Sequence, residues 1–324
     1  MTGLQDTYDV VVIGGGAAGL SGALMLARSR RSVAVIDAGA PRNAPAGGVH
    51  GLLGHDGIPP ADLLARGREE VRRYGGHVVG GEVADTVADA VADGESFKVV
   101  LAGGRAVRAR RLLVTTGLAD RLPDVPGLRE RWGRDVVHCP YCHGWEVRER
   151  RIGVLATGPA SMHQALMFRQ LSDDVVYFTH TAAPLSGEDA EKLAALGVPV
   201  VDGAVRALEI GGDAITGIRL EDGRVVEREV VAVASRMVAR AGFLGGLGLR
   251  AVEHPSGIGE HVPADAAGRT SVAGVWVAGN VTDLMAQVGA SAAAGAAAGA
   301  QINGDLVAED ARLAVAARRE AASG

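Results

Sequence analysis

A run of apolar residues that ends in a glycine-rich turn constrains the fold of this chain more than any other feature. Residues 10–13 are all apolar, as is typical of a parallel strand covered on both faces, and the glycine-rich turn, residues 14–19, follows directly. The pattern then predicts a helix to about Ser29 and a strand at residues 33–36. Asp37 ends that strand roughly 20 residues beyond the glycines, where an acid that binds a ribose is expected. Together these parts predict a dinucleotide-binding unit.

Three glycines of this turn meet three separate steric demands. Gly14 permits the tight turn, Gly16 lets the backbone approach a pyrophosphate, and Gly19 lets the helix and the strand pack closely. Unpaired N–H groups at the start of the helix then face the phosphates. The residues of the turn that we expect to bind the dinucleotide are Gly14, Gly15, Gly16, Ala17 and Gly19.

Both cysteines of the chain lie in one motif, Cys139-Pro140-Tyr141-Cys142, which His138 and His143 flank. Two thiols at this spacing can close a small disulfide ring and reopen it. At the start of a helix and beside a base, the pKa of a thiol can fall from about 8.5 to roughly 3.5–7.5, which makes the thiolate a nucleophile. The motif therefore favours redox catalysis by Cys139 and Cys142.

Two other interpretations of the motif stay open. A zinc site needs four good ligands, but the chain offers only two sulfurs, and histidines adjacent to ligating cysteines rarely point at the same ion. A structural disulfide would stabilise the fold little, because the entropy gained by closing a loop falls as the loop shortens. Both are less favoured than redox chemistry, so we expect no metal site.

Composition limits the classes of partner. With 324 residues, 48% of them hydrophobic and 22% charged, the chain is long enough for two domains with separate cores. A net charge of −5 from interspersed acids and bases favours small metabolites or proteins over nucleic acid or an anionic membrane. Residues 1–9 lack the pattern of a secretion signal, and no apolar stretch is long enough to span a bilayer. We expect a cytoplasmic protein, in which a lone Cys-x-x-Cys is more plausibly catalytic than structural.

Two further apolar strands, at residues 112–117 and 274–280, end in small or polar residues. Both look like the strand ends that close around FAD in flavoproteins with two dinucleotide domains. Asn280 stands where such proteins usually carry an acid for the ribityl chain, and its amide can still accept a hydrogen bond. The residues that this likeness places against FAD are Thr116, Gly117, Asn280, Gln287 and Val288.

With these parts in this order, the chain resembles the low-molecular-weight thioredoxin reductase family over nearly its whole length. Residues 139–146 are more similar to the FAD-dependent dithiol oxidases of the gliotoxin and holomycin type, because the reductases carry an acid where this chain has His143. Residues 41–43 and 50–57 also look like this oxidase group. By resemblance, the FAD contacts here are Asp37, Ala38, Arg42, Asn43 and His50, although His50 and His55 can equally be polar loop residues.

The resemblance implies an α/β fold made of two Rossmann-like, three-layer ββα dinucleotide-binding domains, the second inserted into the first. The expected boundaries are 1–118 and 245–324 for the FAD-binding domain and 119–244 for an inserted NADPH-domain-like part that carries the cysteines. A homodimer is expected by resemblance only. The tail from about Asp305 to Gly324 is predicted to be an amphipathic helix with a frayed end.

A second nucleotide motif in the inserted part is damaged. A strand at residues 152–155 leads into residues 156–161, where only the middle glycine remains: Ala156 replaces the turn glycine and Ser161 replaces the close-packing glycine. The strand at residues 175–178 leads to no arginine that can clamp the 2′-phosphate of NADPH. We therefore predict that NADPH does not bind usefully.

Without NADPH, electrons must enter from a dithiol and leave from the flavin, most simply to dioxygen. The family pattern makes Cys139 the sulfur that a substrate thiolate attacks and Cys142 the sulfur that faces the flavin. His143 is the candidate general base, because an imidazole titrates near working pH, and His138 is a weaker candidate that can equally be a packed strand-end residue. The expected product is an intramolecular disulfide in a small antibiotic-like molecule, with hydrogen peroxide.

Two rivals stay open. One is an NADPH-dependent thioredoxin reductase, in which the same cysteines run in the opposite direction. The other is a non-catalytic flavoprotein that senses redox state or sequesters a dithiol. The substrate itself, whether a dithiolopyrrolone, a diketopiperazine dithiol or another scaffold, is not fixed by any motif.

Overall fold

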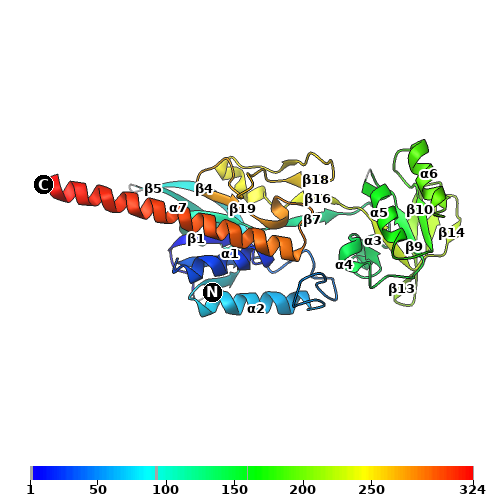
Figure 1. Ribbon diagram of the computed structural model, residues 1–324, viewed down its shortest axis with the longest axis horizontal. Coiled ribbons are helices and arrows are strands. Elements are labelled where there is room, and N and C mark those ends of the chain that lie inside the picture. The colour runs from blue at the N-terminus through cyan, green and yellow to red at the C-terminus, as the bar shows by residue number, and fades with distance from the viewer. Residues whose placement is uncertain (1–2, 92–93, 159, 324) are drawn as a thin grey trace. The chain divides into compact units, whose positions relative to one another are not determined.

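The computed structural model describes residues 3–91, 94–158 and 160–323. Contacts divide the chain into two compact units (Figure 1). The first unit combines the residues up to 42 with 61–119 and those from 238 onward, and the second combines 43–60 with 120–237. The segment 43–60, which the expected boundaries place in the FAD domain, thus has most of its contacts in the second unit.

A parallel sheet forms the centre of the first unit. Its strands, in order across the sheet, are β3 (His77–Gly80), β2 (Val33–Asp37), β1 (Thr7–Ile13), β6 (Ala106–Val114) and β19 (Val275–Val277). An antiparallel hairpin, β4 (Val83–Val91) and β5 (Gly94–Leu101), extends the sheet along the first half of β6. From β1 the chain continues to β2 and β3 on one side of the sheet, whereas β6 pairs with the other side of β1. The order of strands therefore reverses at β1, and ligands of open α/β sheets bind at such points.

Alternate residues of β1 face two separate cores. Val10 and Val12 pack with α1 (Ala17–Arg28) and α7 (Val288–Ser323), whereas Val11 and Ile13 pack with residues of the hairpin. The helices α1 and α7 lie side by side (Figure 1). A Cβ on Gly295 of α7 would lie 1.9 Å from the Ala18 carbonyl oxygen, so glycine is required for this contact. Residues 290–300, which are rich in alanine and glycine, are thus part of a packed helix. The helix α2 (Pro60–Arg73) completes the helical layer.

The second unit repeats this plan. Its parallel sheet has the order β11 (Val200–Val201), β10 (Val175–Phe178), β9 (Ile152–Leu155), β15 (Val230–Val233) and β8 (Val136–Val137). On one face, Ile152 and Val154 pack with Phe168 of α5 (Ala160–Arg169), and α6 (Gly187–Ala195) adds Leu193. On the other face lies an antiparallel sheet of β12 (Val205–Gly211), β13 (Ala214–Leu220) and β14 (Val225–Val226). Two Rossmann-like ββα units, one inserted into the other, are confirmed.

The chain crosses between the units within two strands. These are β7 (Leu118–Arg121) and β16 (Arg236–Ala239), which are neighbours in a four-stranded sheet with β18 (Gly259–His261) and β17 (Val252–Glu253). The short helices are α3 (Leu128–Arg131), α4 (Pro140–His143), η1 (Gly242–Leu247) and η2 (Gly279–Val281). Within the described part of the chain, no helix combines the length and the apolar character needed to cross a membrane.

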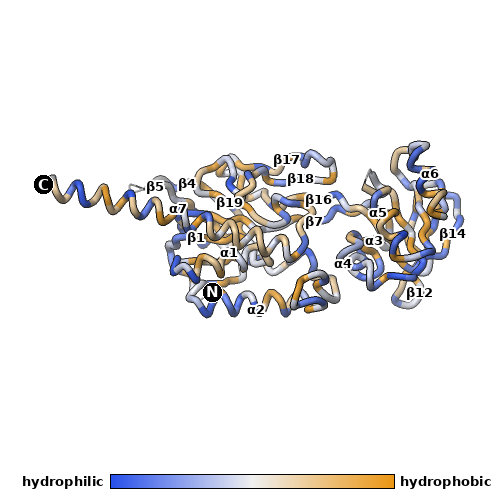
Figure 2. Tube along the Cα trace, viewed as in Figure 1, coloured by the Kyte–Doolittle hydropathy of each residue, from blue (hydrophilic) through white to orange (hydrophobic). Residues whose placement is uncertain are grey.

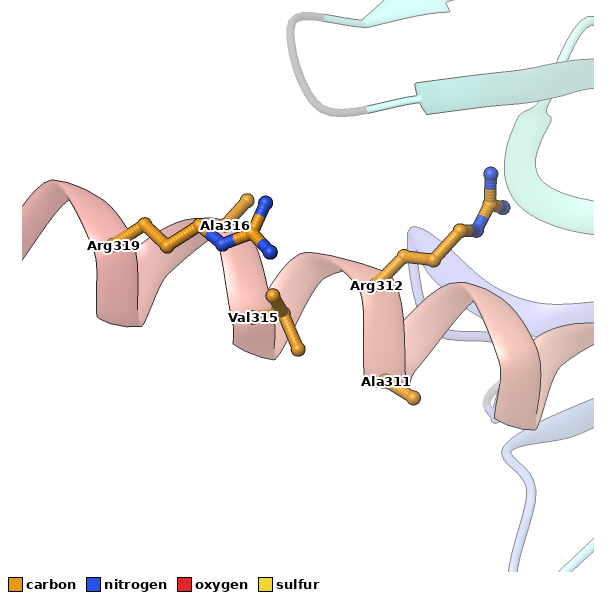
Figure 3. A pocket seen from close by; sticks show the side chains of 5 residues that line it. All are labelled: Ala311, Arg312, Val315, Ala316 and Arg319. Atoms are coloured by element: carbon orange, nitrogen blue, oxygen red, sulfur yellow. The ribbon is translucent and has the colours of Figure 1, made fainter.

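The C-terminal tail is helical, as expected from about Asp305 onward. It continues α7 without a break to Ser323, because residues 305–323 contain no glycine or proline and are rich in good helix formers. Residues 311–322 are exposed on all sides, and apolar and polar residues alternate around this end of the helix (Figure 2). A hollow on it is lined by Ala311, Arg312, Val315, Ala316 and Arg319 (Figure 3). Since it holds no thiol or acid, it is not a candidate redox site.

Candidate active site and cofactor site

The glycine-rich turn after β1 has the backbone that a close phosphate approach requires. Gly14 adopts a φ of 106° and donates its N–H to the Ile36 carbonyl oxygen at 2.8 Å. A Cβ on Gly19 would lie 1.9 Å from the Gly14 carbonyl oxygen, whereas a Cβ on Gly16 would meet nothing within 4 Å. The turn is therefore closed towards the protein and open at Gly16, which is where a pyrophosphate would lie.

Asp37 is held in position at the end of β2. One carboxylate oxygen accepts the Gly15 N–H at 3.2 Å, and the other lies 3.0 Å from Nη2 of Arg68 on α2. An ionised carboxylate has about four acceptor positions, so lone pairs remain for ribose hydroxyls. The sequence analysis missed Arg68, because nothing in a helix of many charged residues marks the one that returns to the sheet.

The ends of β6 and β19 meet the turn at the same edge of the sheet. Thr115 donates its hydroxyl to the Gly14 carbonyl oxygen at 2.8 Å, and the N–H of Ala278 donates to the Val114 carbonyl oxygen at 3.0 Å. Thr116 donates to the carbonyl oxygen of Arg240 at 2.6 Å. Three chain segments thus surround one edge, as a bound dinucleotide needs.

Asn280 organises the turn that leads into α7. Its Nδ2 donates to the carbonyl oxygens of Asp283 at 2.9 Å and Ala286 at 2.8 Å. With the amide nitrogen used in this way, Oδ1 remains as an acceptor for a ribityl hydroxyl. Gln287 follows, and its carbonyl oxygen accepts the Ser291 N–H at 2.8 Å, so α7 begins at Val288. These residues fit FAD.

The division into units separates Arg42 from two other residues that we expect to contact FAD, Asn43 and His50. Arg42 ends the first segment of the first unit, whereas Asn43 and His50 belong to the second. His50 lies between two carboxylates there, with Nε2 3.5 Å from Oε1 of Glu146 and Nδ1 3.7 Å from Oδ1 of Asp56. The FAD contacts of Asn43 and His50 stay predictions.

The Cys-x-x-Cys motif lies at the start of a very short helix in the second unit. Cys139 precedes α4 with an extended backbone, and its carbonyl oxygen accepts the N–H groups of Cys142 at 3.2 Å and His143 at 3.1 Å. Both cysteines are half-buried. Gln164 of α5 donates Nε2 to the His138 carbonyl oxygen at 2.6 Å and so anchors the segment from a second element. A four-residue helix has only a weak dipole with which to stabilise a thiolate.

His143 has the environment of a neutral base. Its Nε2 is buried and has no hydrogen-bond partner among the residues that the structure describes. The pKa of His143 is lowered from its ordinary value, first by burial and also by the nearby charge of His50, while the carboxylate of Glu146 acts in the opposite direction. At neutral pH the ring is therefore uncharged and can accept a proton.

His138 has the environment of a packed residue. Its Nδ1 lies 3.2 Å from the carbonyl oxygen of Val233 and 3.5 Å from the backbone nitrogen of Ser235. Its ring is tilted relative to the Trp132 ring, with 6.3 Å between the two ring centroids. These contacts favour a structural role at the end of β8. A search of the described residues finds no cluster of three or more His, Cys, Asp or Glu side chains that can hold a metal ion.

The damaged nucleotide motif keeps the position of a glycine turn but not its form. Ala156 donates its N–H to the Phe178 carbonyl oxygen at 2.9 Å and does not adopt a positive φ. The N–H of Thr157 donates to Oγ of the fully buried Ser161 at 3.0 Å. After β10, His180 accepts the Val205 N–H at 3.0 Å through Nδ1, and burial lowers its pKa.

Comparison with known proteins identifies relatives along nearly the whole chain. The sequence profile of the pyridine nucleotide-disulphide oxidoreductases matches residues 8–301. The chain is 32% identical to "Thioredoxin reductase tcpT" of Claviceps purpurea (strain 20.1), over 94% of this chain and 96% of that protein.

Solved structures give the same result. The crystal structure of HlmI is 45% identical to this chain, with a TM-score of 0.92 and coverage of 98% of both chains. An oxidoreductase from Agrobacterium tumefaciens is 34% identical, with a TM-score of 0.85 over 93% of this chain and 99% of that chain.

Proposed function

This chain belongs to the pyridine nucleotide-disulphide oxidoreductase family and is an FAD-containing oxidoreductase of the thioredoxin reductase type, and we propose that it is a dithiol oxidase. The proposed reaction converts two thiols of one small natural product into an intramolecular disulfide, with dioxygen as the final acceptor. The substrate class is that of antibiotic-like secondary metabolites. A cytoplasmic location and a homodimer stay predictions.

The hydrogen bond from Thr157 N–H to Ser161 Oγ carries this proposal. In a nucleotide-binding turn, free backbone N–H groups and the helix N-terminus receive the phosphates. Here the first N–H after the turn residue is already paired within the protein, and the serine that accepts it fills the position of the close-packing glycine. A pyrophosphate would have to replace a satisfied, partly buried hydrogen bond, and such a bond contributes about 0.5–1.5 kcal/mol.

His180 also argues against NADPH as the electron donor. NADPH is usually recognised by arginines that form bidentate hydrogen bonds with its 2′-phosphate. At the end of β10 this chain has a histidine whose Nδ1 accepts a backbone N–H and whose pKa is lowered by burial, so it is neutral at pH 7. A neutral imidazole supplies no charge for a phosphate.

The chain's own residues account for the thiol chemistry. A substrate thiolate attacks Sγ of Cys139 in the oxidised pair, the Cys139–Cys142 bond breaks, and Cys142 leaves as a thiolate. His143 Nε2 takes the proton from the second substrate thiol, which then attacks the substrate sulfur of the mixed disulfide and releases Cys139. The substrate loses two electrons and two protons, and the cysteine pair gains the two electrons.

FAD, when bound, would supply the two-electron chemistry that links this electron pair to dioxygen, and the two protons would end on hydrogen peroxide. The residues that would hold it are those of the turn at 14–19 and Asp37, together with Thr116, Gly117 and Asn280 at the neighbouring strand ends. The second unit supplies the cysteines and the base.

Anaerobic mixing separates the proposal from its rivals. The purified yellow protein is mixed either with dithiothreitol, as a minimal dithiol, or with NADPH, and flavin absorbance is followed. We expect dithiothreitol to bleach the flavin and NADPH to leave it oxidised, with Cys142→Ser blocking the dithiol reaction. Rapid bleaching by NADPH would identify a reductase instead. A failure to consume oxygen over many turnovers with the dithiol would identify a non-catalytic flavoprotein.

A further inference from the structure

A loop of the second unit presents His50 to the segment that follows the cysteines. The backbone of Val49 is fixed by two hydrogen bonds, from its N–H to Ile58 and from the Gly57 N–H to its carbonyl oxygen, both 2.8 Å long. The Gly51 N–H donates to Oδ1 of Asp56 at 2.8 Å. The loop therefore holds the residue between Val49 and Gly51 in a fixed position.

His50 and Glu146 form a pair that water reaches only in part. Nε2 of His50 lies 3.5 Å from Oε1 of Glu146, and the side chains are 25% and 39% exposed. Asp56, on the other side of the His50 ring at 3.7 Å, is 70% exposed, so solvent screens its charge more strongly. Glu146 is thus the better-placed carboxylate for a proton on His50.

His143 needs a counter-charge in order to act as a base. Its Nε2 is buried without a partner in the described structure, so a proton taken up there creates an imidazolium in a poorly solvated place. Glu146 is the acid whose charge favours that imidazolium, and His50 is the base whose charge opposes it. The same carboxylate therefore acts on two imidazoles: it lies 3.5 Å from His50, and its charge favours a proton on His143.

The helix packed against α4 adds no competing charge of this kind. It is α5, which carries two titratable residues, His163 and Arg169. His163 is exposed, and Arg169 pairs with Asp173. Besides the two thiols of the motif, the groups that act on His143 are thus Glu146 and His50.

We propose that Glu146 and His50 are positioning residues, in which the Glu146 carboxylate is shared between the two imidazoles and stabilises the proton that His143 removes from a substrate thiol. The role of this pairing in catalysis rests on the proposed dithiol oxidase reaction. The pairing of Glu146 with the two imidazoles does not depend on that reaction. The Glu146 carboxylate supports proton uptake by His143, and the charge of His50 opposes it.

The first test measures the proton on His143 directly and needs no substrate. Imidazole resonances of the FAD-loaded protein with labelled histidine are titrated by NMR, and His143 is assigned by its loss in His143→Gln. We expect Glu146→Gln to lower the His143 midpoint and His50→Gln to raise it. The matched control is Glu149→Gln, which removes the same charge three residues further on and leaves the midpoint unchanged. Equal midpoints in all four proteins would overturn the pairing.

The second test measures the reaction. Anaerobic stopped-flow reduction of the flavin by dithiothreitol is expected to slow about tenfold in Glu146→Gln, to recover in part in Glu146→Asp, and to keep its rate in Glu149→Gln. The acid limb of the pH profile should move in the same direction as the NMR midpoint. If the midpoints move as expected but the dithiol reduces no variant and no wild type, the proposed function fails and the pairing stands. If the dithiol reduces the flavin of the variants at the wild-type rate and the His143 midpoints do not move, the pairing is wrong and the proposed function stands.

Discussion

Ala156 and Gly14 occupy the same position in their two units. Each residue follows the middle strand of its parallel sheet and donates its N–H to a carbonyl oxygen near the end of the neighbouring strand, Phe178 at 2.9 Å and Ile36 at 2.8 Å. Gly14 then takes a φ of 106°, which a residue with a Cβ rarely adopts, and Ala156 does not. One chain therefore contains an open nucleotide turn and a closed copy of it.

Ser161→Ala tests the closed copy. The substitution removes the acceptor of the partly buried Thr157 N–H, and we expect the free energy of unfolding in urea to fall by about 0.5–1.5 kcal/mol. NADPH should still not reduce the flavin, because the His180 position still lacks a cation. Ser271→Ala, at an exposed serine, is the control and should change stability by less than about 0.5 kcal/mol. Flavin reduction by NADPH in Ser161→Ala would show that this hydrogen bond alone closes the turn.

The open turn gives a contrasting pair of substitutions. Gly19→Ala forces a methyl group to within 1.9 Å of the Gly14 carbonyl oxygen, so we expect loss of FAD and a lower melting temperature. Gly16→Ala meets no protein atom within 4 Å, so the apoprotein should melt normally while FAD binds more weakly, because the methyl group occupies the pyrophosphate position. Flavin content after purification and the melting curves of both apoproteins check this. Equal FAD content in the two variants would contradict it.

His143→Ala removes the candidate base. We expect the rate of flavin reduction by a dithiol to fall by about 10²–10⁴-fold with FAD still bound, which stopped-flow absorbance measures. Since burial holds the pKa of His143 below 6.5, the wild-type rate should persist below that pH and decline only as the pH falls through the lowered value. His138→Ala is the comparison, and a larger loss there would transfer the role of base to His138.

Acid should also destabilise the fold through two half-buried histidines. The pKa values of His143 and His180 are lowered in the folded state, mainly by burial. Just below pH 6.5 the unfolded chain therefore binds more protons than the folded one, and stability falls as the pH drops through this window. Urea unfolding between pH 7.5 and 5.5 measures the slope. His180→Gln should flatten it, and an unchanged slope would show that His180 does not contribute.

Local patterns in the sequence predicted the elements that surround the site. The strands that end at Ile13, Leu155 and Phe178 follow from short apolar runs, and the helix after each turn follows from the change of period. The contacts that the sequence did not predict join residues that lie far apart in the chain. The partners of Asp37 and His50 lie 31 and 96 residues away, on Arg68 and Glu146, and one charged surface residue looks like another in a sequence. The helix of the tail, by contrast, was predictable, because its local helix propensity is strong enough to extend α7 beyond its packed part.

Glu309→Ala tests where the packed part of α7 ends. Glu309 is only 9% exposed and lies 2.7 Å from Arg110 and 3.2 Å from the buried Arg111 of β6, so its removal takes one of several carboxylates away from each guanidinium. We expect a loss of about 1.5–3 kcal/mol in the free energy of unfolding, because hydrogen bonds to charged groups contribute about this much and both arginines keep other carboxylates. Glu320→Ala, in the exposed end of the same helix, should change stability by less than about 0.5 kcal/mol. Chemical denaturation of the FAD-loaded proteins compares them, and similar losses in both variants would mean that the end of α7 is as firmly packed as its start.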